Sequence, residues 1–236
     1  MATTDTTNFN LDLNELAEEA FSRCGTEMRT GYDLKTARRS LNLLTIDWAN
    51  RGINLWTIEE GSIPLTQGTA AYDLPVDTID LLEHQVRTGS STSQQDLTIS
   101  RISVSTYASI PNKNATGRPI QVWIDRKSGA TNSSSVVQVP QVYVWPTPDQ
   151  SNFYTLVYWR MRRIQDAGNG VNTQDIPFRM LPCLVSGLAY YLSLKIPEAT
   201  DRIPMLKQDY EEQWLVASSE DREKAPLRLA PREFLY

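Results

Sequence analysis

One stretch of the chain, residues 176–191 with the sequence IPFRMLPCLVSGLAYY, is apolar at nearly every angle of a helix. A helix without a wide polar face must be surrounded by other elements, because any open side would place apolar surface in water. The stretch is interrupted by Pro182, Ser186 and Gly187, and it is shorter than the roughly 20 apolar residues that span a bilayer. We therefore expect a buried central helix, with a helix at a membrane interface as the weaker alternative.

The composition is that of an ordinary globular protein, with 40% hydrophobic and 22% charged residues among 236. The formal net charge of -5 argues against a protein that neutralises phosphates over its whole surface, although it allows a local basic stripe. Residues 1–10 lack the basic and apolar regions of a signal peptide. We therefore expect the chain to be made and to fold in the cytoplasm.

Helical periodicity flanks the central stretch on both sides. Residues 10–24 place apolar side chains three and four positions apart, and Gly25 ends the pattern. A second amphipathic helix is expected to start after Asp33, as the N-cap, and to end at Gly52. A further helix is expected from about Ile203, so that two helices precede and two follow the middle of the chain.

In the middle of the chain, β-branched and aromatic residues with turn signals replace the helical period. Strands are expected at residues 55–64, 79–87, 97–102, 119–125, 136–145 and 154–162, with a short edge near Tyr72 and a short helix over 104–110. The short connections favour an antiparallel sheet or a small sandwich. Residues 167–175 are expected to be a linker back to the helices.

Together these patterns predict an α+β fold in which N- and C-terminal helix pairs form a four-helix bundle around an inserted antiparallel β-sheet or sandwich domain. Such an insertion is tolerated because the ends of a loop between packed helices lie close together. The expected divisions are a flexible N-terminus at 1–9, the helical bundle at 10–52 and 176–224, the inserted β domain at 53–175, and an extended C-terminal arm at 225–236.

The last segment, APLRLAPREFLY at residues 225–236, contains two prolines that prevent it from continuing a helix. It nevertheless ends in Phe234, Leu235 and Tyr236, which a solvated tail has no reason to carry. Two alternatives follow. The segment packs back on its own domain, or it is an arm that becomes ordered on a partner.

Residues that could carry catalysis are scarce. His84 is the single histidine, and we expect it to be satisfied by its neighbours on a strand. Glu59 and Glu60 are adjacent on a strand and point to opposite faces, so they would not act as an acid and base pair. Cys24 and Cys183 are expected to be buried thiols, with a disulfide as the alternative. Because the motifs HExxH, GxSxG, GKS/T and GxGxxG are also missing, we expect no enzyme, metal site or cofactor.

Cationic residues gather in the sequence WRMRR, where Arg160 and Arg162 share one face of a strand. The cluster lacks the aromatic pattern of an RNA-binding sheet, so we expect structural ion pairs or contacts between subunits, with proximity to DNA as a further alternative. A different class of function, a carbohydrate- or receptor-binding β module, is suggested by Trp123, Trp145 and Trp159. That function would require at least one of these rings in solvent.

Several longer phrases occur in a characteristic order: LNLLTIDWANRGINLWTIEEG, YDLP, IPNKNATGRP, VWPTPD, YTLVYWRMRRIQDAGN, and GLAYYLSLKIP followed by QDYEEQW. From about Leu13 onward, the chain resembles the head-to-tail adaptors of short-tailed bacteriophages, which are tail tubular or packaged-DNA stabilisation proteins. The phrases are not catalytic motifs, so the resemblance rests on their order and on the architecture.

The resemblance implies a structural virion protein at the head-tail junction: a ring of typically twelve copies between the portal protein and the tail nozzle protein, around a DNA ejection channel. It implies that the C-terminal arm binds the portal, through Leu227, Arg228, Leu229, Arg232, Phe234, Leu235 and Tyr236. The candidate contacts with neighbouring subunits or the nozzle are Arg38, Arg39, Arg160, Arg162 and Arg163. Loop tips at residues 90–95 and 129–135 are further candidates for nozzle contacts.

Double-stranded DNA would pass through the lumen of such a ring without sequence-specific binding. Even a handful of cationic contacts binds phosphates strongly at moderate salt, so the acidic balance of the chain fits a lumen through which DNA slides. Rings that form on a template are often monomeric beforehand, because one interface is weak without avidity. We therefore expect a monomer at micromolar concentration, with no membrane partner.

Overall fold

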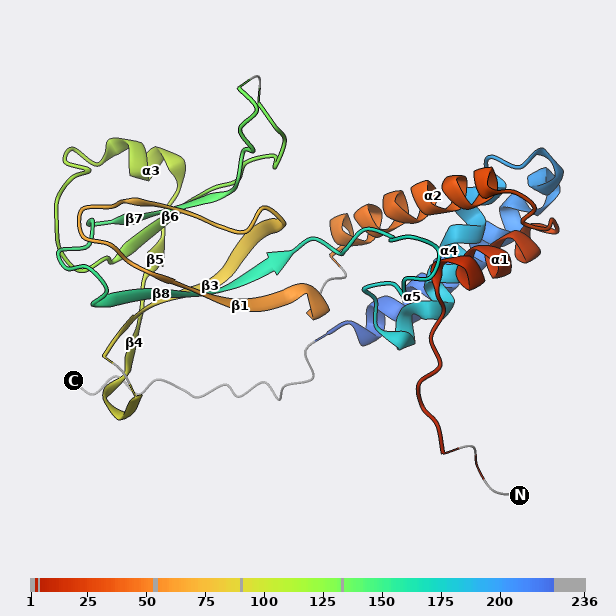
Figure 1. The fold of residues 1–236 in the computed structure, drawn as a ribbon, viewed down its shortest axis with the longest axis horizontal. Helices are drawn as coiled ribbons and strands as arrows, with labels where there is room; N and C mark the ends of the chain where they lie inside the picture. The colour runs from red at the N-terminus through yellow and green to blue at the C-terminus, as the bar shows by residue number, and fades with distance from the viewer. Residues whose placement is uncertain (1–2, 4, 53–54, 90, 133, 223–236) are drawn as a thin grey trace, which may run out of the picture. The chain divides into compact units, whose positions relative to one another are not determined.

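The computed structural model describes residues 3, 5–52, 55–89, 91–132 and 134–222, and within them it contains five α-helices and two four-stranded β-sheets (Figure 1). The fold is therefore mixed α+β. The chain divides into two compact units. The helical unit comprises the described residues up to Trp56 and from Ile164, and the β unit comprises Thr57–Arg163. The predicted C-terminal arm at 225–236 lies outside the described residues.

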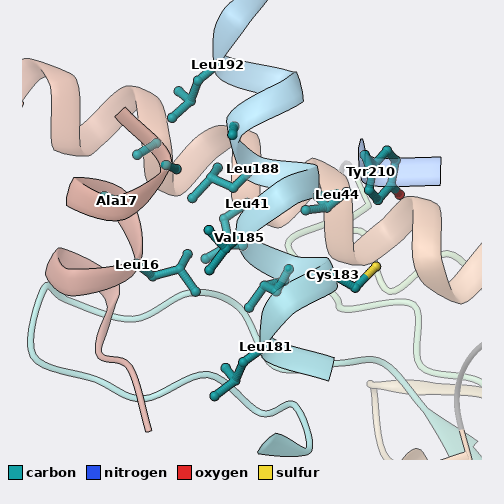
Figure 2. Close-up of a cluster of buried hydrophobic side chains, with 14 of the residues drawn as sticks. Leu16, Ala17, Leu41, Leu44, Leu181, Cys183, Val185, Leu188, Leu192 and Tyr210 are labelled. Carbon is teal, nitrogen blue, oxygen red and sulfur yellow. The ribbon is translucent and has the colours of Figure 1, made fainter. Parts of the chain in front are cut away.

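The helical unit is arranged around one buried helix, α4. The α-helices of this unit are α1 (Leu13–Cys24), α2 (Gly31–Asn50), α4 (Leu181–Ser193) and α5 (Ile203–Glu220), with 3₁₀ turns at Phe178–Met180 and Pro197–Arg202. Helix α4 contacts each of the other three. Figure 2 shows the labelled side chains of α4 next to Leu16 and Ala17 of α1, Leu41 and Leu44 of α2, and Tyr210 of α5. The prediction of a buried central helix is confirmed.

Two residues that interrupt the apolar pattern of α4 are explained by their positions. Pro182 lies in the first turn of the helix, where a missing backbone N–H leaves no intrahelical bond unmade. Gly187 lies where α4 approaches its neighbours, since a Cβ there would be 2.9 Å from Leu44 Cδ2 and from Tyr210 Cε2. The helix ends at Ser193, and the apolar side chain that follows it, Leu194, is exposed rather than buried.

The starts of α1 and α2 are set by capping boxes. Helix α1 has Asp12 as its N-cap, and it ends at Gly25, whose φ of 81° fits the left-handed conformation that glycine adopts readily. Helix α2 has Thr30 as its N-cap, and Asp33 is the third residue of the helix, where its carboxylate accepts from the Thr30 N–H at 3.0 Å. The prediction of Asp33 as the N-cap was therefore wrong, because Asp33 is the second member of the capping box.

The segment from residue 164 to 175 packs on the helical unit, although the sequence suggested a linker in the β domain. The N–H groups of Leu13 and Asn14 donate to the carbonyls of Asn172 at 3.2 Å and Gly170 at 3.1 Å. The Ala167 N–H donates to the side chain of Asn42 in α2. The bonds of Leu13 and Asn14 satisfy backbone N–H groups at the start of α1, which have no partner inside the helix.

The β unit contains two sheets that share one core. The first has the strand order β1 (Ile58–Pro64), β8 (Tyr154–Arg162), β3 (Thr78–Thr88), β4 (Gln95–Thr98). The second has the order β2 (Ala71–Asp73), β7 (Gln141–Trp145), β6 (Gln121–Asp125), β5 (Ser100–Arg101). All pairs are antiparallel except β5 with β6. Leu81 and Leu156 of the first sheet belong to the same buried cluster as Val122 and Val142 of the second.

Three expected strands differ from the structure. Leu55–Thr57 is a 3₁₀ turn, and β1 begins only at the next residue. The expected strand at 97–102 divides at Ile99, a buried residue between β4 of the first sheet and β5 of the second. The expected strand at 136–145 is reduced to β7, because Pro140 just before it has no N–H to donate to a ladder. By contrast, β8 and the short helix α3 (Val104–Ser109) are confirmed.

Strand β3 departs from simple alternation. Its register against β8 shifts between Thr78 and Asp80 and again between Leu81 and Glu83. Because each bulge adds a residue to one strand, Leu81 and His84 are both buried although they are three positions apart. The bulges therefore decide which side chains of β3 enter the core.

Candidate interaction surfaces

The groups most often used in catalysis are buried. Cys24 donates through Sγ to the Ala189 carbonyl at 3.3 Å, and both cysteines are free thiols. Burial raises the pKa of Cys24 to about 11 and that of Cys183 to about 12, which keeps them protonated at neutral pH. His84 meets the expectation only in part, because it has a hydrogen bond with the backbone of Ile99 while its buried Nδ1 has no partner among the described residues. Burial, together with the charge of Arg101, lowers the pKa of His84.

Other kinds of site are not found in the part of the chain that the structure describes. No group of three or more His, Cys, Asp or Glu side chains there is arranged to hold a metal ion. Likewise, none of the helices formed by these residues combines the length and the hydropathy that crossing a bilayer requires.

The arginines of β8 lie in a cluster of carboxylates inside the β unit. Glu59 of β1 is directly opposite Arg160 in the antiparallel register. The guanidinium of Arg160 donates to Asp77 Oδ1 at 2.6 Å and to Glu59 Oε2 at 2.9 Å. Arg162 Nε donates to Glu59 Oε1 at 2.6 Å. Both arginine side chains are only 11% exposed.

The electrostatics of this cluster favour its charged form. Burial lowers the pKa of Arg160, but the hydrogen bonds and charges of Asp77 and Glu59 outweigh burial and raise it overall. For Asp77, burial raises the pKa, yet the hydrogen bond and charge of Arg160 outweigh burial and hold it below its usual value. The structural ion pairs expected for these arginines are therefore present. Arg163 is exposed, and its backbone N–H donates to the Asp77 carbonyl. Contacts of Arg160, Arg162 and Arg163 with other subunits or the nozzle stay a prediction.

Helix α2 has an apolar side that the described residues of the helical unit leave exposed. Tyr32, Arg39, Leu43 and Ile46 are spaced at helical intervals along this side, which we call the outer face of α2, and Arg38 lies beside it. Leu43 is 51% exposed and Ile46 is 46% exposed. A helix of a monomer in water normally carries polar residues at such positions. Arg38 and Arg39 are both exposed, and their contacts with other subunits or the nozzle stay a prediction.

Helix α5 has a comparable side with the opposite charge. Met205, Glu212, Leu215 and Val216 form what we call the outer face of α5. The three apolar side chains are 60%, 67% and 64% exposed. The opposite side of the helix is in the core, where Trp214 contacts the ring of Trp48 with centroids 5.8 Å apart. The helical unit therefore carries two partly apolar faces, one with cations and the other with a carboxylate.

The loop tips of the β unit differ in how firmly they are held. Residues 129–132 and 136–138 form a small hairpin, in which the Gly129 N–H donates to Gln138 and the Asn132 N–H donates to Val136. The side chains of Val136 and Val137 are 55% and 45% exposed near its tip. The tip after β3 contains a 3₁₀ turn, Ser91–Ser93, with exposed residues only. The hairpin is thus the tip with exposed apolar residues.

The tryptophans of the β unit are half-buried rather than open. The ring of Trp123 lies against Tyr107 of α3 and Tyr143 of β7, with centroids 5.0 Å and 4.7 Å apart. Trp145 Nε1 donates to the Asn112 carbonyl at 3.0 Å, and Trp159 is also only partly exposed. A sugar platform needs an open ring face, so these rings give the carbohydrate-binding alternative little support.

Sequence reasoning identified the cationic residues but did not predict the exposed apolar side chains of the two outer faces. The signal was present in α2, where Leu43 and Ile46 depart from the polar pattern expected of a solvated side. It was present in α5 as the pair Leu215 and Val216 next to the buried Trp214. Helical spacing alone could not show which of several apolar stripes faces the core.

The comparison with protein families agrees with this picture of a protein built for assembly. The model of the SU10 adaptor protein family matches residues 12–230. No curated protein matches the chain significantly. The family match covers most of the chain and both units. The chain therefore belongs to the SU10 adaptor protein family, and it is a structural adaptor protein of a bacteriophage virion.

Proposed function

We propose that this adaptor forms a ring, typically of twelve copies, that joins the portal to the tail nozzle and encloses part of the DNA ejection channel. The helical unit builds the ring as a four-helix bundle, and the β unit meets the nozzle. Family membership supports an adaptor that contacts portal and tail components. The observation that carries the ring is the pair of outer faces on α2 and α5.

The two outer faces are complementary. In a closed ring each subunit uses two different surfaces, one toward each neighbour. The outer face of α2 presents Arg39 with Leu43 and Ile46, whereas the outer face of α5 presents Glu212 with Leu215. We assign them to each other across the subunit boundary, because this contact covers both apolar faces and pairs opposite charges. Arg38 belongs to the same contact.

The arm and the loop tips complete the assignment. In this proposal the C-terminal arm at 225–236 binds the portal through its apolar anchors, with Arg228 and Arg232 as charged partners. The hairpin tip with Val136 and Val137 contacts the nozzle, because exposed apolar residues at a loop tip gain most from being covered. DNA passes through the lumen without sequence-specific binding.

The test measures the molecular mass of the protein and images it by electron microscopy, both alone and mixed with the purified portal of its phage. We expect a monomer at micromolar concentration and a ring on the portal. Arg39→Glu and Glu212→Arg should each prevent the ring, because each brings like charges together. The double variant should restore it, because the pair is then reversed. Arg29→Glu, an exposed change of the same charge outside the outer face, is the matched control.

The outcomes separate the parts of the proposal. Rings that form normally with both single variants would show that α2 and α5 are not the subunit interface. A chain truncated before Ala225 should fail to bind the portal. If the full-length chain does not bind the portal either, the adaptor ring itself is refuted for this protein.

A further inference from the structure

A groove in the helical unit runs between the segment before α1, α1 itself and the start of α4. Its volume is about 1120 Å³, above the roughly 300–1,000 Å³ of pockets that hold small molecules. Leu181 and Val185, one turn apart on α4, are only 5% and 3% exposed and form its floor, and Leu11 also lines it (Figure 2 shows the first two). Phe9 and Phe178, also in the lining, are 75% and 76% exposed. Apolar surface of this extent indicates a site that another segment covers.

One wall of the groove is acidic. Glu15, Glu18 and Glu19 of α1 line it together with Arg23, so that three carboxylates face one cation. Glu15 caps its own helix, and Glu19 pairs with Arg23 at 3.1 Å. Glu18 is exposed and makes no hydrogen bond or ion pair with the residues that the structure describes. The groove therefore suits an extended apolar segment that also carries positive charge.

The C-terminal segment of the chain has this chemistry. Residues 225–236, APLRLAPREFLY, combine apolar residues with Arg228 and Arg232, which outnumber the single acidic residue Glu233. Pro226 and Pro231 favour an extended backbone, which lowers the entropy that is lost on docking. Charge and shape thus match the acidic apolar groove.

The chain also leaves the described structure close to this groove. The Asp221 carboxylate, directly after α5, lies 3.8 Å from the guanidinium of Arg179. Arg179 follows Phe178, which lines the groove. Fourteen residues follow position 222, and at about 3.3–3.6 Å per residue they can extend roughly 46–50 Å. The segment can therefore reach along the groove without a second copy.

We propose that residues 225–236 dock in the groove of their own chain, with the arginines beside Glu18 and the apolar side chains against Leu181, Val185 and Phe178. The arm is then covered in the free protein, and the portal has to compete for it. This inference goes beyond the proposed function, and its test needs no portal.

The test places a nitroxide on the arm of the full-length protein. In an Ala230→Cys variant the label reacts selectively, because Cys24 and Cys183 are buried and their raised pKa values keep them unreactive. Docking should broaden the backbone NMR signals of the groove residues Ser22 and Val185 much more than that of Arg38 on α2. Glu18→Arg should lower the docking equilibrium constant up to about fivefold, the size expected for an exposed ion pair.

Two further variants show whether the weaker docking expected for Glu18→Arg comes from the groove itself. Glu198→Arg makes the same charge change at an exposed position outside the groove and should leave the broadening as it is. Phe178→Ser removes an exposed ring without opening the core and should weaken docking independently of charge. If Glu18→Arg does not fold, the Phe178→Ser variant still decides.

Two results would overturn the proposal. Equal broadening at groove residues and at Arg38 would mean that the arm does not dock there. Equally strong broadening of isotope-enriched chains that carry no nitroxide, when they are mixed with spin-labelled chains of natural isotope abundance, would mean that the groove takes the arm of a second copy. Loss of portal binding with unchanged groove broadening would count against the proposed function and leave this inference standing.

Discussion

The helical unit and the β unit stabilise their chain by different means. In the helical unit, α4 buries Leu184, Leu188 and Ala189 completely against helices from both ends of the chain. In the β unit, an apolar core between two sheets is supplemented by the ion cluster around Arg160. Apolar burial is non-directional and tolerates small shifts, whereas the cluster depends on the register of β1 against β8. The first unit is thus sensitive to lost volume and the second to lost charge.

The largest effect is expected from a cavity in the helical core. Leu188→Ala should lower the free energy of unfolding by about 3–4 kcal/mol, because the side chain is 0% exposed and its neighbours can collapse only partly. Urea unfolding followed by far-UV circular dichroism measures it. Leu194→Ala is the control, since Leu194 is 57% exposed and should change stability by less than about 0.5 kcal/mol. Similar values for both would contradict the central role of α4.

A smaller effect is expected from the ion cluster. Arg160→Gln should destabilise the β unit by about 2 kcal/mol, because it removes the guanidinium that pairs with Asp77 and leaves Glu59 paired with Arg162 alone. The value is below that of a fully buried pair because the two carboxylate side chains are 41% and 43% exposed. Hydrogen exchange should become faster in β8 but not in α4.

The matched change for this cluster is Arg126→Gln. Arg126 pairs with Asp80 at 3.3 Å, but its side chain is 60% exposed. The free energy of unfolding should therefore fall by at most about 0.5 kcal/mol in this variant. If both arginine variants behave alike, the cluster has no special part in the stability of the β unit.

Gly187→Ala tests close packing in the helical unit. Alanine favours a helix over glycine by about 0.5–1 kcal/mol, but overpacking costs about 1–3 kcal/mol. Because the added Cβ would be 2.9 Å from Leu44 and from Tyr210, the cost of overpacking should exceed the gain in helix propensity. Thermal unfolding should show that the free energy of unfolding falls by about 1 kcal/mol. Gly31→Ala, where a Cβ would meet nothing within 4 Å, should be neutral or slightly stabilising. Stabilisation by Gly187→Ala would show that α4 can move away from its neighbours.

The smallest effect concerns His84 and pH. Burial lowers the pKa of His84 in the folded state below its ordinary 6.5, so below pH 6.5 the unfolded chain binds more protons than the folded one. His84 therefore does not reduce the free energy of unfolding above pH 6.5. As the pH falls from 6.5 toward the pKa of His84 in the folded state, the free energy of unfolding decreases by at most about 1.4 kcal/mol per pH unit. From neutral to mildly acidic pH, the melting temperature should fall less for His84→Gln than for the unchanged protein. An identical pH dependence in both proteins would exclude His84 as the cause.

The candidate surfaces could be predicted only in part. Arg38 and Arg39 are exposed, as the period of α2 indicated. The side shared by Arg160 and Arg162 followed from the alternation of β8, but their carboxylate partners did not, because Asp77 lies far from them in sequence. The groove beside α1 was not predicted either, since its lining comes from segments at both ends of the chain.

Local sequence patterns were enough to predict the apolar helix α4, the amphipathic α1 and α2, the strand β8, and the order in which helices and strands follow one another. These depend on side-chain period and on caps, which act within a few residues. Three features became visible only in the folded chain: the bulges that turn His84 inward, the packing of residues 164–175 on α1, and the exposed apolar faces of α2 and α5. Each of these depends on groups that are distant in sequence, and no local pattern encodes which of them meet.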